Sequence, residues 1–184
     1  MSRFTGFLSS LFGWLFVGLS LIVVGETVAR KLFSFSLQGA DELGGYILAV
    51  GSGLAFTVAF VDRAHIRIDL LHAKLPPRAR MLIDWFSVVS LAALALLLTY
   101  TGWLVVDETI EFGSTAPTPW ATPMIYPQGA WFVTLVIFAL VTLAAAVRAS
   151  WLLASGRRAQ LAAEYGPKSA EEELEAELED LNKR

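Results

Sequence analysis

The chain is poor in the residues on which most enzymes and disulfide-bonded proteins depend. Its 184 residues include two histidines and no cysteine, and 17% of them are Asp, Glu, Lys or Arg. Without cysteine no disulfide scaffold can form. The sequence also contains no G-x-S-x-G, no H-E-x-x-H and no glycine-rich phosphate loop, so we expect no catalytic residues and no enzyme activity.

Charge is absent from four long stretches. The uncharged runs contain 22, 19, 22 and 36 residues and cover residues 4–25, 43–61, 85–106 and 112–147. A helix needs about 20 predominantly apolar residues to cross a bilayer core. The runs predict an all-α integral membrane protein with four transmembrane helices, at about residues 7–29, 39–61, 81–106 and 128–155. They exclude a soluble enzyme and a nucleic-acid binder.

The basic residues near these spans are unevenly divided between the two sides of the membrane. Two of them, Arg30 and Lys31, follow the first span. Nine would lie on the other side, namely Arg3, Arg63, Arg67, Lys74, Arg78, Arg80, Arg148, Arg157 and Arg158. Because Lys and Arg are enriched in cytoplasmic segments, both termini are predicted to be cytoplasmic.

Two polar segments lie outside the spans. Residues 62–80 are too polar to cross a bilayer, and their mixture of apolar and charged side chains predicts a short interfacial helix between spans two and three. Residues 161–184 carry eight of the 17 acidic residues and predict an acidic cytoplasmic tail helix. The expected organisation is a transmembrane domain at residues 1–160 followed by this tail.

The two histidines are the candidates for binding haem or a metal ion. His65 and His72 both lie in the segment between spans two and three. A haem inside a helix bundle needs ligands that project inward from facing helices. We therefore expect no cofactor and no metal site, and interpret the histidines as interfacial residues near lipid headgroups.

Ionisable residues at the ends of the spans have a structural and a functional interpretation. Glu26 and Arg30 are four residues apart, so they can pair along one face of span one. Asp41 and Glu42 begin span two and Asp84 begins span three, where acidic residues favour the positive end of a helix. No charge lies at the centre of any span, so the sequence predicts no ion path in this chain.

Small residues form a stripe along span two. Gly45, Ala49 and Gly53 are spaced four residues apart and would allow another helix to approach closely. The spacing predicts helix contact at this stripe without identifying the partner helix.

The order of several short motifs resembles one transporter family. A-D-E-L-G-G-Y (40–46) opens span two, and A-H-I-R-I-D-L-L (64–71), which includes Arg67 and Asp69, follows that span. Y-T-G-W (100–103) leads to E-F-G-S-T-A-P-T-P (111–119) before span four. In this order, with four spans, the motifs resemble the small membrane subunit (DctQ type) of a tripartite ATP-independent periplasmic (TRAP) transporter. The similarity covers about residues 10–155.

The resemblance implies a role and two protein partners. The chain would be the small permease subunit of a sodium-coupled transporter in a bacterial inner membrane. One partner would be the large TRAP membrane subunit, whose scaffold this chain would brace and which would hold the substrate and sodium sites. The other would be a periplasmic substrate-binding protein that delivers an organic anion. Membrane lipids would surround the complex.

Residues 107–127 are a candidate contact for the binding protein. This segment holds four of the seven prolines and three acidic residues, Asp107, Glu108 and Glu111. We expect an ordered extracytoplasmic loop or a re-entrant segment, without regular helix. A stiff loop can dock at low ordering cost, with help from Arg30 and Lys31. The alternative is that the loop packs on the large subunit while its aromatic residues anchor it at the lipid interface.

Two other functions compete with the transporter subunit. A membrane anchor of a redox enzyme complex would require haem ligands, which the placement of the histidines disfavours. A complete small transporter or channel would require an ion path, which the uncharged span centres disfavour.

Overall fold

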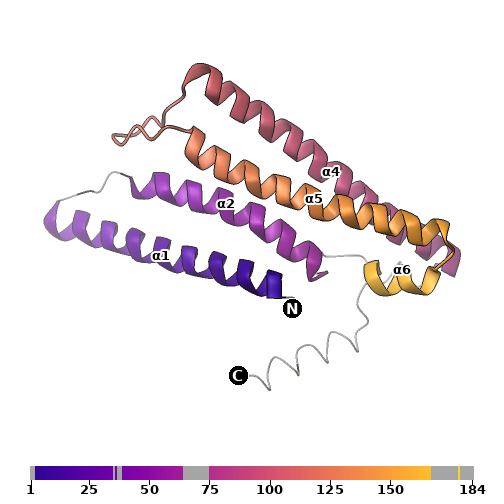
Figure 1. Ribbon diagram of the computed structural model, residues 1–184. Helices are drawn as coiled ribbons and strands as arrows, with labels where there is room; N and C mark the ends of the chain where they lie inside the picture. The colour runs from indigo at the N-terminus through magenta and orange to yellow at the C-terminus, as the bar shows by residue number, and fades with distance from the viewer. Residues whose placement is uncertain (1–2, 35, 37–38, 64–74, 167–177, 179–184) are drawn as a thin grey trace.

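The computed structural model describes residues 3–34, 36, 39–63, 75–166 and 178 (Figure 1). In these residues the fold is all-helical, and its helices are α1 (Arg3–Phe33), α2 (Ala40–Val61), α4 (Pro77–Phe112), α5 (Ile125–Ala154) and α6 (Arg158–Tyr165). The first four are long and apolar enough to cross a membrane. The predicted fold class and its four spans are confirmed.

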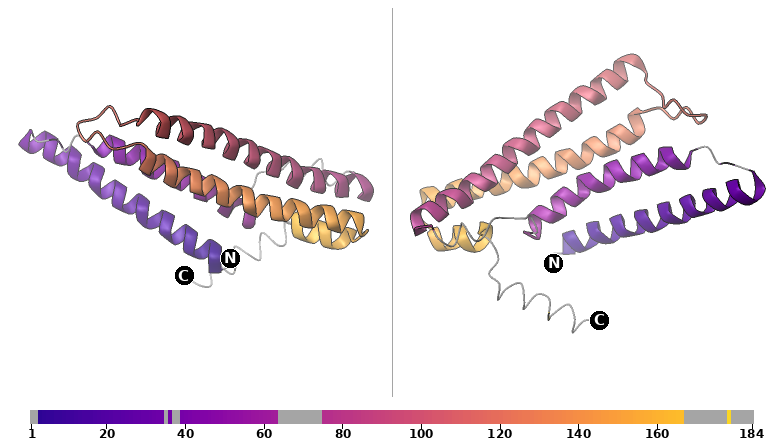
Figure 2. Two further views of the ribbon diagram at one scale, coloured as in Figure 1. Left: turned by 45° about the horizontal axis from the view of Figure 1, so that its top comes forward. Right: turned by 180° about the vertical axis from the view of Figure 1, so that it is seen from behind.

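The four long helices lie side by side as an open row rather than a closed bundle. α5 packs between α4 and α2, and α1 packs against α2 at one edge of the row. The views in Figures 1 and 2 show the same order, α1–α2–α5–α4, with α1 and α4 at opposite edges. Within this chain, side chains on both faces of the row therefore remain exposed.

The tightest helix contacts depend on small residues. A Cβ atom on Gly53 of α2 would overlap the Thr134 hydroxyl of α5, and one on Gly102 of α4 would lie 2.9 Å from Leu135 of α5. Alanines and a few large apolar side chains fill the seam between α4 and α5, namely Val88, Ala92, Ala95, Phe138, Ala139, Ala149 and Leu152. Short side chains let the helix backbones approach closely, as in other membrane bundles.

The helices extend beyond the uncharged runs. α4 has 36 residues, or about 54 Å at 1.5 Å per residue, compared with a hydrocarbon core of about 30 Å. Residues 107–112 are the last turns of α4 and residues 125–127 the first turn of α5, so the expectation of a non-helical segment over all of 107–127 was wrong. Pro127 is tolerated because the first turn of a helix leaves its N–H groups without intrahelical partners.

α4 begins earlier than expected, and this changes the role of Asp84. Pro76 is the N-cap and Pro77 the first helical residue, so Asp84 lies in the third turn rather than the first. The favourable field of a helix N-terminus fades within one turn. Asp84 is instead a core residue, 2% exposed.

Several predictions concern residues outside the described part. One is the interfacial helix expected over 62–80, of which residues 64–74 are not described. Another is the tail helix, of which residues 167–177 and 179–184 are not described. His65, His72, Arg67 and Asp69 also lie outside the described residues. Within the described part, α6 crosses the expected boundary between residues 160 and 161 and packs on α4 and α5.

Candidate functional site

Candidate functional residues gather at the two ends of the helix row. The loop end comprises residues 113–124, the last turn of α1 and the first turn of α2 (Figure 1). The α6 end comprises α6, the C-terminal turns of α2 and α5 and the first turns of α4.

Residues 113–124 form a small hairpin. Thr115 and Pro123 make an antiparallel bridge, flanked by hydrogen bonds from Ala116 N to Thr122 O (2.9 Å) and from Met124 N to Ser114 O (3.0 Å). At its tip, Ala121 N donates to Thr118 O at 2.9 Å. The prolines that prevent helix here fix φ and stiffen the hairpin.

A buried carboxylate attaches this hairpin to α2. Glu42, in the first turn of α2 and 9% exposed, accepts a hydrogen bond from Tyr46 Oη at 2.7 Å and another from the Thr118 hydroxyl of the hairpin. Glu42 lies in the first turn of α2, where an acidic residue favours the positive end of the helix, and it makes this tertiary contact in addition. Tyr46 and Thr118 were not predicted as site residues. Glu42 and Thr118 are 76 positions apart, and no periodic pattern in the sequence connects residues at that distance.

A tryptophan makes a second attachment of the hairpin. The ring of Trp120 lies over Gly39, where a Cβ atom would be 2.5 Å from the ring. The close approach requires glycine before α2. Trp120 still remains about half exposed, so its outer face is available at the loop end.

The charged residues expected to dock a binding protein are exposed but divided. Asp107, Glu108 and Glu111 lie on the last turns of α4, whereas Arg30 and Lys31 lie in the last turn of α1. Since α1 and α4 are the two edges of the row, the loop end has an acidic edge and a basic edge. The hairpin extends from α4 and α5 to the start of α2, between these edges. The structure does not bring the two groups together.

The remaining predicted site residues differ in exposure, although the sequence pattern had grouped them on shared helix faces. Glu26 is buried and accepts a hydrogen bond from Ser36 Oγ (2.6 Å), while Arg30 is exposed. In the small-residue stripe, Gly53 is buried against α5, whereas Gly45 is exposed with no side chain within 4 Å. Ala49 is half-buried and Asp41 is exposed.

The α6 end is held by a bidentate ion pair. Arg148 lies six residues before the end of α5 and donates from Nε to Glu164 Oε2 (2.5 Å) and from Nη2 to Glu164 Oε1 (2.6 Å). The hydrogen bonds from Arg148 hold the pKa of the Glu164 carboxyl below its usual range, and burial raises the pKa of the Tyr165 phenol. Neither Arg148 nor Glu164 was predicted as a site residue.

Two further contacts fix α6 to the row. Leu161 is completely buried in the α4–α5 core, and Arg63 Nη1, just after α2, donates to the carbonyl of Ala163 at 2.8 Å. Among the described residues, no group of three or more His, Asp or Glu residues is placed to hold a metal ion.

Comparison with known proteins gives one family. The family model of tripartite ATP-independent periplasmic transporters, DctQ component, matches residues 19–150, which run from the middle of α1 into the last turns of α5. Comparison with curated proteins gives no match.

Proposed function

Because this chain belongs to the DctQ family of components of tripartite ATP-independent periplasmic transporters, we propose that it is the small permease subunit that braces the large membrane subunit. The large subunit would hold the substrate and sodium sites. A periplasmic binding protein would deliver the substrate, an organic anion, and the complex would lie in a bacterial inner membrane.

The observation that carries this proposal is the distribution of ionisable residues along the four long helices. In the four long helices, every Asp, Glu, Lys and Arg lies within seven residues of a helix end. A transport path through a membrane is usually marked by ionisable residues inside the spans. The middle of this row offers no such path, which supports an accessory rather than a conducting role.

The exposed apolar faces of the row are the surfaces that a partner or lipid would cover. On α1 they include Phe7, Leu11, Trp14, Leu21, Val28 and Leu32, at three- to seven-residue intervals along one side of the helix. Trp14 is 75% exposed although it lies near the middle of the helix. This supports α1 as an edge on which the large subunit or lipid packs.

Copurification tests the proposed partnership. A tagged copy of this chain, expressed with the large TRAP membrane subunit and the binding protein of the same organism, should retain the large subunit in detergent. Loss of the large subunit at low salt and mild detergent would contradict the bracing role.

The orientation is tested by cysteine labelling in a chain that has no native cysteine. Thr115→Cys, on the exposed hairpin, should react with a membrane-impermeant maleimide in intact spheroplasts. Gln160→Cys, exposed on α6, should react only after permeabilisation. We expect at least a tenfold difference in labelling between the two variants, because the basic α6 end is predicted to be cytoplasmic. The opposite pattern would reverse the proposed orientation.

The acidic edge of the loop end is proposed to steer the binding protein. Replacing Glu108 and Glu111 with lysine should lower transport severalfold at low ionic strength, with the difference shrinking as salt is added, because rim charges act mainly on the rate of encounter. The large subunit should still copurify.

Arg158→Glu, which reverses an exposed charge at the opposite end, is the control and should leave transport unchanged. If the lysine pair separates the two membrane subunits, this edge packs on the large subunit instead. If transport is unchanged at every salt concentration, the edge has no docking role.

A further inference from the structure

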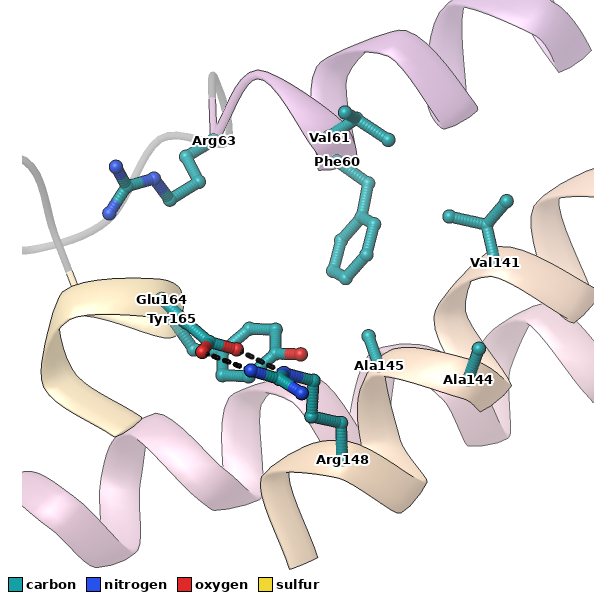
Figure 3. A pocket seen from close by; sticks show the side chains of 9 residues that line it. All are labelled: Phe60, Val61, Arg63, Val141, Ala144, Ala145, Arg148, Glu164 and Tyr165. Carbon is teal, nitrogen blue, oxygen red and sulfur yellow. Dashed lines mark hydrogen bonds and ion pairs between the residues drawn. The ribbon is translucent and has the colours of Figure 1, made fainter. Parts of the chain in front are cut away.

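A cavity of about 340 Å³ lies at the α6 end, between the C-terminal turn of α2 and the later turns of α5, with α6 closing one side (Figure 3). Its apolar wall includes Phe60 of α2 and Val141, Ala144 and Ala145 of α5. Figure 3 shows the Phe60 ring pointing from α2 towards α5 and α6. The volume is at the lower end of the range of small-molecule sites, which is about 300–1,000 Å³.

The polar side of the cavity is cationic. Arg63 and Arg148 line it together with one acid, Glu164, so the lining has a net formal charge of +1. Arg148 uses Nε and Nη2 for Glu164, and Arg63 uses Nη1 for the Ala163 carbonyl. A guanidinium has five N–H groups, so each side chain has more donors than these contacts occupy within the described part of the chain.

The backbone of Arg63 is strained. Its φ is +54°, in the left-handed region that favours glycine, and it follows directly after the end of α2. A non-glycine residue stays in this region only where its surroundings hold it there, and such residues cluster at active sites and ligand clamps. The conformation places the Arg63 side chain beside α6 and at the edge of the cavity (Figure 3).

The depth of the cavity matches the boundary between acyl chains and headgroups. Arg148 lies six residues, or about 9 Å, before the end of α5. Phe60 and Val61 are the last residues of α2, and α6 with its exposed Arg158 lies beyond them. The apolar wall therefore continues along the spans while the arginines lie where a spanning helix leaves the hydrocarbon.

We propose that this cavity binds an anionic phospholipid, with the headgroup phosphate on Arg63 and Arg148 and an acyl chain along Phe60, Val141 and Ala144. Guanidinium groups bind phosphate oxygens through charge-assisted hydrogen bonds, often two at a time. Glu164 keeps Arg148 in place and limits the positive charge of the cavity. The proposal requires that these helices cross a bilayer, and it is independent of the transport role.

Native mass spectrometry of the full chain, released from detergent, tests the proposal with two lipids of identical acyl chains. Phosphatidylglycerol should bind about tenfold more tightly than phosphatidylcholine. Both lipids carry the phosphate, but the quaternary ammonium of choline is repelled by a cavity lining of net charge +1, whereas glycerol is neutral. Arg63→Gln should remove most of this preference. Arg78→Gln, which changes an exposed basic residue of α4 at the same end, should retain it.

A second variant tests the cavity itself. Ala144→Phe adds a ring to the apolar wall and should lower the binding of phosphatidylglycerol about tenfold without changing the charge. Ala93→Phe, at an exposed position of α4 outside the cavity, is its control and should leave binding unchanged.

Three results would overturn the proposal. One is a phosphatidylglycerol preference that survives both Arg63→Gln and Ala144→Phe. Another is displacement of the lipid by millimolar inorganic phosphate, which would identify a site for a free anion. The third is loss of the bound lipid when the large subunit is present, which would show that protein rather than lipid fills the cavity.

Discussion

Gly53→Leu is expected to destabilise the chain by about 3 kcal/mol and to lower its thermal unfolding midpoint by several degrees. A Cβ atom at this position would overlap the Thr134 hydroxyl and lie 2.8 Å from Thr134 Cβ. Thr134 cannot move aside easily, because its side chain is β-branched and its hydroxyl donates to Trp131 O at 2.6 Å. α2 and α5 would have to separate at the centre of the row.

Gly45→Leu is the matched control on the same helix. No side chain lies within 4 Å of a Cβ atom placed there, so the change should not destabilise the isolated chain. It should stabilise the chain by up to about 1 kcal/mol, because leucine favours helix more than glycine does. Unfolding of both variants in detergent can be followed by circular dichroism. Equal stability of the two variants would contradict the packing of α2 on α5. Loss of the large subunit from Gly45→Leu alone would place that subunit on the exposed face of α2.

Glu42→Ala is expected to release the hairpin at residues 113–124 from α2. The substitution removes the acceptor that Tyr46 Oη and the Thr118 hydroxyl share, and a lost hydrogen bond to a charged group costs about 1.5–3 kcal/mol. Amide hydrogen exchange of the hairpin should become at least tenfold faster, because local opening exposes the amides of Ala116, Ala121 and Met124. Exchange in the middle of α5 should not change.

Asp41→Ala is the control for this substitution, since Asp41 is the exposed neighbour of Glu42 and carries the same charge. Its hairpin should exchange at the wild-type rate. If Glu42→Ala also leaves the exchange unchanged, Trp120 over Gly39 holds the hairpin without the carboxylate. If both variants accelerate exchange equally, the effect comes from charge at the start of α2 rather than from the contact with Thr118.

The four spans could be predicted from the sequence because bilayer thickness sets a length that uncharged runs must match. The helix ends could not be predicted in the same way. α4 continues through Asp107, Glu108 and Glu111 at one end and begins before Arg78 and Arg80 at the other. Lys, Arg and Glu are compatible with helix, so charge marks the border of the hydrocarbon rather than the end of the helix.

The site residues were predicted less completely because their contacts join distant parts of the chain. Glu42 was identified by its position at the start of a span, but its contact with Thr118 depends on the hairpin folding back over α2. Arg148 and Glu164 are brought together by the turn between α5 and α6, which places Leu161 in the core. The order α1–α2–α5–α4 is likewise a result of packing that no local pattern contains.

The small-residue stripe illustrates the same limit. The spacing of Gly45, Ala49 and Gly53 indicated one contact face, yet Gly53 contacts α5 while Gly45 faces outward. A helix between two neighbours turns its small residues towards more than one of them. In α2, Gly51 is the position that approaches α1, where a Cβ atom would lie 2.8 Å from a carbon of the Phe12 ring.

Reconstitution into proteoliposomes tests the proposed bracing role most directly. The large subunit, this chain and the binding protein would be combined, and uptake of the organic anion that the binding protein carries would be measured under an inward sodium gradient. We expect uptake with all three proteins, a loss of at least 90% when this chain is omitted, and no uptake by this chain alone. Full uptake without this chain, or sodium-dependent uptake by this chain alone, would contradict the role of a non-conducting subunit required for transport.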